Sequence, residues 1–334
     1  MSDAYRGAGV DTEAAAKAVT LIADLAARTT RPEVADHVGG FAGLFRIGED
    51  RLLAAATDGV GTKLEIARRL GRLDTVGIDL VAMCADDVVC TGAEPLFFLD
   101  YLAVGKVVPE RVASIVEGVA EGCRRAGCAL LGGETAEHPG VMPEDQFDLA
   151  GFCVGSVGER DLLGPHRVRD GDVLIGLPSS GLHANGYSLV RSLLGDRPLD
   201  ETVPELGRTL GEELLEPCAI HAPVVLALHR AGLLHAAAHI TGGGLVENLP
   251  RALPDGSGAR VERGTWREHP IFGLLAREGS LTDADLFSTF NMGLGMILVV
   301  GPEHAPAVLE KTYGAVHIGT VVTGSGVEVL TRGD

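Results

Sequence analysis

The stretch LLAAATDGVGTKLEIARRLG, residues 52–71, contains the strand, loop and helix signals on which the fold prediction depends. Residues 52–58 are apolar enough for a strand, and the helical pattern of 64–70 stops at Gly71. The loop between them, GVGTK at 59–63, offers backbone N–H groups and a positive charge to an anion. Its order differs from the P-loop pattern GxxxxGK[ST], because the lysine comes last and the threonine precedes it.

Strand-like and helix-like segments alternate along the rest of the chain, which is typical of α/β proteins. A polar, turn-rich segment at 160–172 interrupts the alternation, as domain boundaries often do. We therefore expect an α/β (α+β) protein with two domains, residues 1–168 and 169–334. The expected strands are 96–105, 129–135, 148–157, 173–177 and 292–300, and the expected helices are 78–95, 109–127 and one after the loop 178–188; a glycine turn between a strand end and a helix is expected in 240–253.

Composition and charge limit the partners of the protein. The chain has 334 residues, 46% of them hydrophobic, and a formal net charge of −18 without any compensating basic block. This charge repels nucleic acid and anionic membranes, so we expect neither as a partner. The N-terminus lacks a basic segment followed by an apolar core, and we expect a cytoplasmic protein. The six cysteines lie in apolar contexts without a CxxC pair, which indicates buried core residues.

Three acidic residues occupy places where an isolated carboxylate is costly. Asp58 ends a strand, Asp87 interrupts an apolar helix, and Glu134 ends another strand. Brought together, they could bind Mg²⁺, which prefers hard oxygen ligands and the phosphates of a substrate. The alternative for each acid alone is a helix cap or a solvated surface position.

Longer motifs identify a family. The chain resembles the aminoimidazole ribonucleotide synthetases, also called phosphoribosylformylglycinamidine cyclo-ligases, over nearly its whole length. The strings that carry the resemblance are TDGVGTK (57–63), GAEPLFFLDY (92–101), LLGGETAE (130–137), DLAGFCVG (148–155), SSGLHANGYSLVR (179–191), TGGG (241–244) and FNMGLGM (290–296).

The resemblance implies an ATP-dependent ring closure of formylglycinamidine ribonucleotide in purine biosynthesis. ATP phosphorylates the amide oxygen, and an amidine nitrogen then displaces phosphate, so positioning and charge neutralisation dominate the chemistry. The family fold implies a homodimer in which the N-terminal sheet joins its twofold mate in a β-barrel, with a C-terminal α/β domain behind it. ATP and Mg²⁺ are the implied cofactors, and a requirement for K⁺ stays open.

The resemblance also implies roles for individual residues. We expect Asp58, Asp87 and Glu134 to hold magnesium, in this subunit or across the dimer. Lys63, Gly59, Gly61 and Thr62 are expected at the ATP phosphates, whereas Asp100 is either a nucleotide or metal contact or a structural acid. His183 and Asn185 are expected at a substrate phosphate or a proton transfer, and the alternative for His183 is an exposed loop residue. Thr241, Gly242 and Gly243 form a candidate second anion site, or else a glycine turn that packs a strand on a helix.

The chain departs from the family pattern at one position near the expected metal. Asp86 stands where many members have asparagine, which places an extra negative charge beside Asp87. We expect this charge to raise magnesium affinity or to perturb the pKa of a neighbouring carboxylate. Two rival functions are a related enzyme with another acceptor and a non-catalytic nucleotide-binding subunit. A non-catalytic subunit would be expected to lack one of Asp58, Lys63, Asp87 or Glu134, and this chain has all four.

Overall fold

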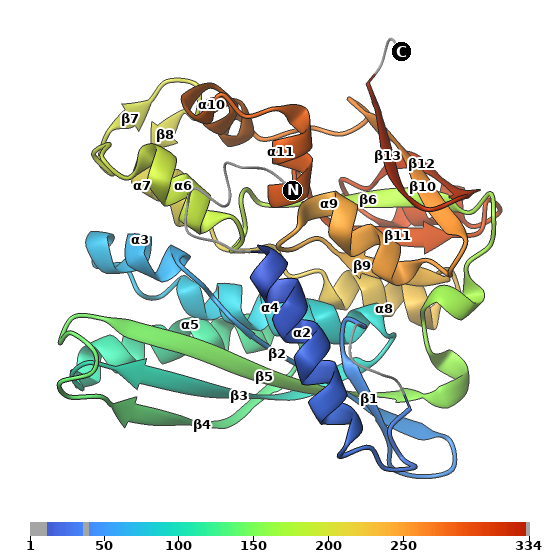
Figure 1. The fold of residues 1–334 in the computed structure, drawn as a ribbon, viewed down its shortest axis with the longest axis horizontal. Coiled ribbons are helices and arrows are strands. Elements are labelled where there is room, and N and C mark those ends of the chain that lie inside the picture. Colours follow the sequence, from blue (N-terminus) through green and yellow to red (C-terminus); the bar gives the residue numbers. More distant parts are fainter. Residues whose placement is uncertain (1–11, 36–39, 332–334) are drawn as a thin grey trace.

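Two β-sheets organise the fold in the computed structural model, which describes residues 12–35 and 40–331 (Figure 1). The first sheet has five strands in the order β1-β2-β5-β3-β4, and the second has six in the order β13-β10-β12-β6-β11-β9. Helices pack around both sheets, which confirms the predicted α/β (α+β) class. Among the described residues β1 and β4 are the outer strands of the first sheet, and the barrel implied by the resemblance stays a prediction.

The first half of the chain supplies the first sheet and the helices beside it. Its elements are α2 (Thr12–Ala27), β1 (Gly43–Arg46), β2 (Arg51–Gly59), α3 (Lys63–Leu70), α4 (Val76–Cys90), β3 (Glu94–Val104), α5 (Pro109–Ala126), β4 (Ala129–Glu137) and β5 (Phe147–Gly158). The strand and helix expected within 52–71 are β2 and α3, and Gly71 ends α3 with a positive φ of 64°. Proline starts α5 and Gly127 ends it with φ 79°, as its sequence predicts.

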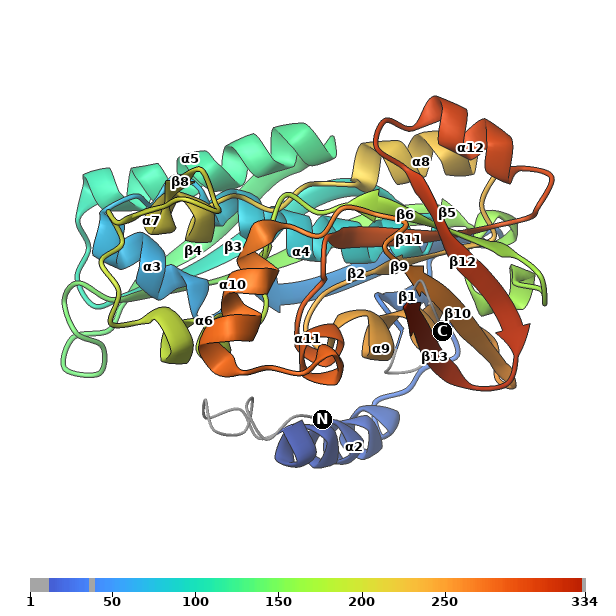
Figure 2. The same ribbon diagram turned by 90° about the horizontal axis from the view of Figure 1, so that it is seen from above.

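Helices α4 and α5 cover one face of the first sheet, whereas no helix of the described residues covers the opposite face, called the open face below (Figure 1). Every residue of α4 except Asp87 is buried, which explains why its sequence is apolar on all sides. The open face carries large exposed hydrophobic side chains on three strands, among them Tyr101, Leu131 and Phe152. Helix α2 lies apart from this sheet (Figure 2).

The second half of the chain supplies the second sheet. Its main elements are β6 (Val173–Pro178), α6 (Tyr187–Leu194), α7 (Leu210–Leu214), α8 (Ala222–Arg230), β9 (Ala236–His239), α9 (Gly244–Asn248), β10 (Ser257–Arg263), α10 (Pro270–Gly279), α11 (Asp283–Thr289), β11 (Leu294–Val300), α12 (Ala305–Lys311), β12 (Val316–Thr323) and β13 (Gly326–Thr331). Short elements complete it, namely β7 (Thr202–Val203), β8 (Arg208–Thr209) and the 3₁₀ turns Glu159–Asp161, Pro165–Arg167 and Leu249–Ala252. All seven residues of β11 are buried because the sheet is covered on both faces there.

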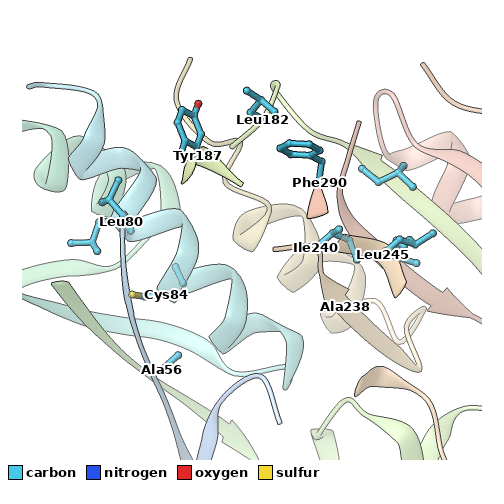
Figure 3. Close-up of a cluster of buried hydrophobic side chains, with 14 of the residues drawn as sticks. Ala56, Leu80, Cys84, Leu182, Tyr187, Ala238, Ile240, Leu245 and Phe290 are labelled. Atoms are coloured by element: carbon cyan, nitrogen blue, oxygen red, sulfur yellow. The ribbon is translucent and has the colours of Figure 1, made fainter. Parts of the chain in front are cut away.

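The hydrophobic core runs through both halves of the molecule without a break. One cluster includes Ala56 and Leu80 beside the first sheet together with Tyr187, Ile240 and Phe290 in the second half (Figure 3). The two halves therefore bury apolar surface against each other, and α4 is the element between them.

Several elements differ from the sequence prediction. The helix expected over 78–95 ends at Cys90, and β3 begins at Glu94, because the chain turns at Gly92 with φ 82°. The sequence prediction did not include β1, β10, β12 or β13. All six cysteines are free, and only Cys128 is not fully buried, in agreement with the predicted core role. No helix within the described residues is long and apolar enough to cross a membrane.

The close crossing of α4 and α5 gives a direct test of the packing. A Cβ at Gly77 would overlap backbone atoms of Gly118 and Val119 in α5. We expect Gly77→Ala to lower stability by roughly 1–3 kcal/mol or more, because rigid backbone cannot move aside. Thermal unfolding should show the loss in Gly77→Ala but not in the control Gly48→Ala, since nothing lies within 4 Å of a Cβ at Gly48. An unchanged midpoint in Gly77→Ala would contradict the crossing geometry.

Candidate active site

Two of the three predicted acids meet where the N-terminal sheet faces the second half of the chain. Asp58 lies near the end of β2, and Asp87 is the half-buried residue near the end of α4. The Nδ1 atom of His239, at the end of β9, is 2.9 Å from Oδ1 of Asp87. Asp58 and Asp87 are close enough for the charge of Asp87 to affect the pKa of Asp58. The site is therefore built from both halves of the chain.

The carboxylates and the histidine of this cluster shift one another's pKa values. Burial and, to a smaller extent, the charge of Asp87 raise the pKa of Asp58 to about 6, although the hydrogen bond from the Gly59 N–H opposes this shift. Burial alone would lower the pKa of His239, but the hydrogen bond to Asp87 and the nearby carboxylates outweigh it and raise that pKa. A pair of neighbouring carboxylates that repel each other is a donor set that suits Mg²⁺.

The third predicted acid, Glu134, lies elsewhere. Asp58 pairs across the sheet with Gly151, Gly151 with Asp100, and Asp100 with Gly133, so these four residues share the face covered by helices. Glu134 follows Gly133 and is exposed, so its side chain lies on the opposite, open face. Three strand spacings separate β2 from β4, about 14 Å. Within the described residues no group of three or more His, Cys, Asp or Glu side chains could hold a metal ion.

Asp100 occupies the buried face of the first sheet. A Cβ at Gly133 would collide with its carboxylate, so the glycine of the GGET segment leaves room for this acid. Burial raises the pKa of Asp100, and a backbone hydrogen bond opposes the shift. Asp100 therefore lies on the same face of the sheet as Asp58, with one strand, β5, between their strands.

Lys63 does not lie where a phosphate contact requires it. Its ammonium is fully buried and donates to Asp79 at 3.0 Å, to the His183 carbonyl at 2.9 Å and to the Glu216 carbonyl at 2.7 Å. Burial alone would lower the pKa of Lys63, but the Asp79 carboxylate raises it, so the ion pair persists. All three donors of the ammonium are used within the protein. Lys63 therefore stabilises the fold and, contrary to our expectation, does not contact a phosphate in this arrangement.

The His183 side chain is also used in hydrogen bonds within the protein. It is 2% exposed and has a positive φ of 62°. Its Nε2 atom accepts from the N–H groups of Ser180 at 3.1 Å and Ala219 at 3.3 Å, which requires a neutral ring with the proton on Nδ1. Burial lowers the pKa of His183 far below its usual value, and the nearby histidines and Lys63 act in the same direction. The expected proton transfer by this residue does not fit a buried, neutral acceptor.

The extra acid Asp86 faces away from the expected metal. Its fully buried carboxylate accepts from the N–H groups of His221 at 3.0 Å and Ala222 at 2.8 Å and lies 3.0 Å from Nδ1 of His221. It therefore satisfies the first N–H groups of α8. Neighbouring side chains on a helix point about 100° apart, so the Asp86 carboxylate is turned away from the Asp87 carboxylate, and its effect on magnesium affinity stays a prediction.

Asn185 and the glycine turn that follows Thr241 lie together in the second half of the chain. A Cβ at Gly242 would lie 3.6 Å from Nδ2 of Asn185, and Oδ1 of Asn185 is buried without a hydrogen-bond partner among the described residues. Thr241 Oγ1 contacts Asn248 Oδ1 at 3.3 Å, and Asn248 Nδ2 donates to the Gly242 carbonyl at 3.0 Å. Gly243 has φ 87°, which lets the chain turn into α9.

The loop before α3 stays open to ligands. Gly61 has φ 69° and is exposed, and Gly59 is half-buried at the end of β2. Thr62 is exposed, precedes the first residue of α3 and makes no side-chain cap; its Oγ1 lies 3.2 Å from Oγ of Ser188 in α6. The loop thus contacts the second half of the chain through two hydroxyl groups.

Sequence reasoning missed the residues that complete the Asp58 and Asp87 cluster. His239 follows three alanines in a four-residue strand, and Arg251 lies in a 3₁₀ turn, so neither belongs to a long motif. Arg251 donates to Asn248 Oδ1 at 3.0 Å, and its charge opposes the raised pKa of Asp58. A histidine two residues before TGGG was the available signal.

Comparisons with known proteins identify the class and then the family. The descriptions "AIR synthase related protein, N-terminal domain" and "AIR synthase related protein, C-terminal domain" match residues 39–157 and 169–331. A protein of Geobacillus kaustophilus (strain HTA426) named phosphoribosylformylglycinamidine cyclo-ligase is 50% identical, over 100% of this chain and 99% of the relative. One of the same name from Acetivibrio thermocellus is 53% identical over 92% of each. The chain belongs to the phosphoribosylformylglycinamidine cyclo-ligase family.

Solved structures share the fold. The structure of tt0281 from Thermus thermophilus has a TM-score of 0.67 and 26% identity, covering 94% of this chain and 95% of its own. AaThiL complexed with AMPPCP and TMP has a TM-score of 0.67 and 19% identity, covering 92% of this chain and 91% of its own.

The buried Lys63 and Asp79 pair can be tested by removing one charge at a time. We expect Lys63→Met to lower stability by roughly 3–5 kcal/mol, because it leaves Asp79 buried and unpaired. The double variant Lys63→Met/Asp79→Leu should recover part of the loss, and Lys106→Met should cost little because its pair with Glu144 is exposed. Chemical unfolding measures all three. A Lys63→Met protein as stable as the wild type would refute the structural role.

Proposed function

We infer that the protein closes the imidazole ring of aminoimidazole ribonucleotide from formylglycinamidine ribonucleotide, with conversion of ATP to ADP and phosphate. The observation that carries this conclusion is about 50% identity to cyclo-ligases along the full chain. The neighbouring carboxylates of Asp58 and Asp87 support it, because they are ligands of the kind that Mg²⁺ prefers and lie beside the loop that precedes α3. The enzyme is thus a ligase of purine biosynthesis, and we propose that it acts in the cytoplasm.

The reaction needs a better leaving group than an amide oxygen. Transfer of the γ-phosphoryl group to that oxygen breaks the terminal P–O bond of ATP and releases ADP. The amidine nitrogen then attacks the same carbon, the new C–N bond closes the ring, and phosphate leaves with the former amide oxygen. Magnesium, when bound, neutralises charge on the transferred phosphoryl group. A potassium requirement is compatible with this scheme and is not needed by it.

Asp58 and Asp87 are the residues that we propose as magnesium ligands in this subunit. His239 holds the Asp87 carboxylate by its 2.9 Å contact and so fixes the orientation of the ligand. The backbone of Gly59, Gly61 and Thr62 binds the ATP phosphates in this proposal, in accordance with the open loop. Asp100 supports the sheet beneath them.

For the substrate, we propose the cradle of Asn185 and Thr241–Gly243. Its support is the buried, unpartnered Oδ1 of Asn185 beside a glycine turn. Lys63 and His183 act behind this cradle as positioning residues, since Lys63 binds the His183 carbonyl and His183 accepts two backbone N–H groups. We also propose residue 168 as the end of the N-terminal domain, because the second sheet begins at Val173.

We propose that the active form is a homodimer joined through the open face of the first sheet. This face exposes Tyr101, Leu131 and Phe152, a surface that a second copy would cover. Glu134 lies on that same face, opposite to Asp58, so we propose a place at the dimer interface for it and not a place beside Asp58 and Asp87. The β-barrel of the family would result from joining the two open sheets.

Turnover tests the function directly. Protein supplied with ATP, Mg²⁺ and formylglycinamidine ribonucleotide should yield ADP, phosphate and aminoimidazole ribonucleotide in equal amounts. Asp87→Ala should lose turnover by about 100-fold or more, because a second carboxylate ligand is absent, while its thermal midpoint stays near that of the wild type. Asp74→Ala is the control, since Asp74 lies outside this cluster.

Two outcomes distinguish the rivals. ATP hydrolysis that depends on a different acceptor would favour a related enzyme of the same superfamily. Nucleotide binding without any turnover would favour a non-catalytic subunit.

A further inference from the structure

Because Lys63 is buried, another cation must bind a substrate phosphate. A protein with a net charge of −18 needs a local positive group to bind a phosphorylated ligand. Lys63 is buried and paired with Asp79. Arg68 forms a bidentate pair with Glu65, at 2.7 and 2.8 Å, and also contacts Asp145. Neither cation has charge left for a ligand.

A cavity of about 420 Å³ opens beside the loop that precedes α3. Gly61 and Thr62 form one wall, Asp148 lies at the start of β5, and Arg191 of α6 reaches the cavity from the second half of the chain. The hydroxyl groups of Thr62 and Ser188 meet at 3.2 Å beside it. The cavity therefore lies between the two halves and borders a loop that the proposed function already uses.

Arg191 is the cation of this cavity whose charge is free to bind a ligand. Among the residues that the structure describes, none forms a hydrogen bond or ion pair with its guanidinium. It is half-buried and lies three residues after Ser188, on the same side of α6. The hydrogen bonds from Arg68 lower the pKa of Glu65, and the charge of Arg191 contributes to that shift. The positive charge of Arg191 therefore lies near Glu65, which also lines the cavity.

We propose that Arg191, together with the hydroxyl groups of Thr62 and Ser188, binds the phosphate monoester of the ribonucleotide substrate in this cavity. The proposal rests on the proposed function, because it assigns a subsite for that substrate. A guanidinium can bind two phosphate oxygens at once, and two hydroxyl groups can donate to the others.

The charges of the cavity favour the ribonucleotide over ATP as the source of the phosphate. Asp148 contributes a carboxylate to the lining, and its Oδ1 accepts from the Leu149 N–H at 2.9 Å. One available cation and one carboxylate complement a ligand that carries both a phosphate and a basic amidine. The triphosphate of ATP brings several negative charges that Arg191 alone would not neutralise, whereas the Asp58 and Asp87 cluster suits its magnesium ion.

Steady-state kinetics of Arg191→Gln test the subsite and separate the two sources of phosphate. We expect the KM for formylglycinamidine ribonucleotide to rise about 10- to 100-fold, the effect of losing a charge-assisted hydrogen-bond pair. The KM for ATP should change less than about twofold. Arg191→Lys should recover part of the affinity, since it keeps the charge without the bidentate geometry. Arg69→Gln is the matched control, because Arg69 is exposed on α3 and outside the cavity.

A binding measurement separates failure of the subsite from failure of the proposed reaction. Ribose 5-phosphate should bind the wild type more tightly than ribose does, and Arg191→Gln should remove that difference. This result would support the phosphate subsite even if the wild type showed no turnover. An unchanged KM for the ribonucleotide in a folded Arg191→Gln protein, or a rise confined to the KM for ATP, would overturn the proposal. Equal binding of ribose 5-phosphate by wild type and variant would overturn it as well.

Discussion

The buried ion pair between Lys63 and Asp79 is the interaction that fixes the position of the two sheets relative to each other. Removing two charges from water is costly, and further hydrogen bonds to the Lys63 ammonium and to Asp79 Oδ1 offset part of the cost, whereas Asp79 Oδ2 has the ammonium alone, at 2.9 Å. Lys63 also binds the carbonyls of His183 and Glu216, and Asp79 accepts from the Cys218 N–H at 2.7 Å. Each of these three backbone groups belongs to the second half of the chain, so one ion pair orients both halves.

Helix α4 extends this arrangement toward the site. Asp86, seven residues after Asp79 and thus two helical turns along the same side, accepts from the N–H groups that open α8. Asp87 is the next residue and is turned toward His239. The carboxylate proposed as a metal ligand is therefore held by the same helix that joins the halves. A change that shifts α4 should disturb stability and metal binding together.

The sequence was sufficient for the fold class, and it singled out two acids that lie near each other. The glycine stops of α3 and α5 act locally, so their ends could be predicted, and carboxylates in apolar segments revealed Asp58 and Asp87. A lysine after glycines looks the same whether it faces a phosphate or a buried acid, which is why Lys63 was misassigned. His239 was missed because its role comes from a contact across 152 residues of sequence. The side of the sheet on which Glu134 lies depends on a register shift between β3 and β4 that no local pattern records.

The central claim is that the metal and nucleotide site is assembled from both halves of one chain. A crystal structure of the protein with a non-hydrolysable ATP analogue and Mg²⁺ tests it most directly. The account predicts magnesium bound by Asp58 and Asp87, with His239 of the second half in contact with Asp87 and the nucleotide phosphates at the loop that precedes α3. Nucleotide bound away from Asp58 and Asp87 would contradict it.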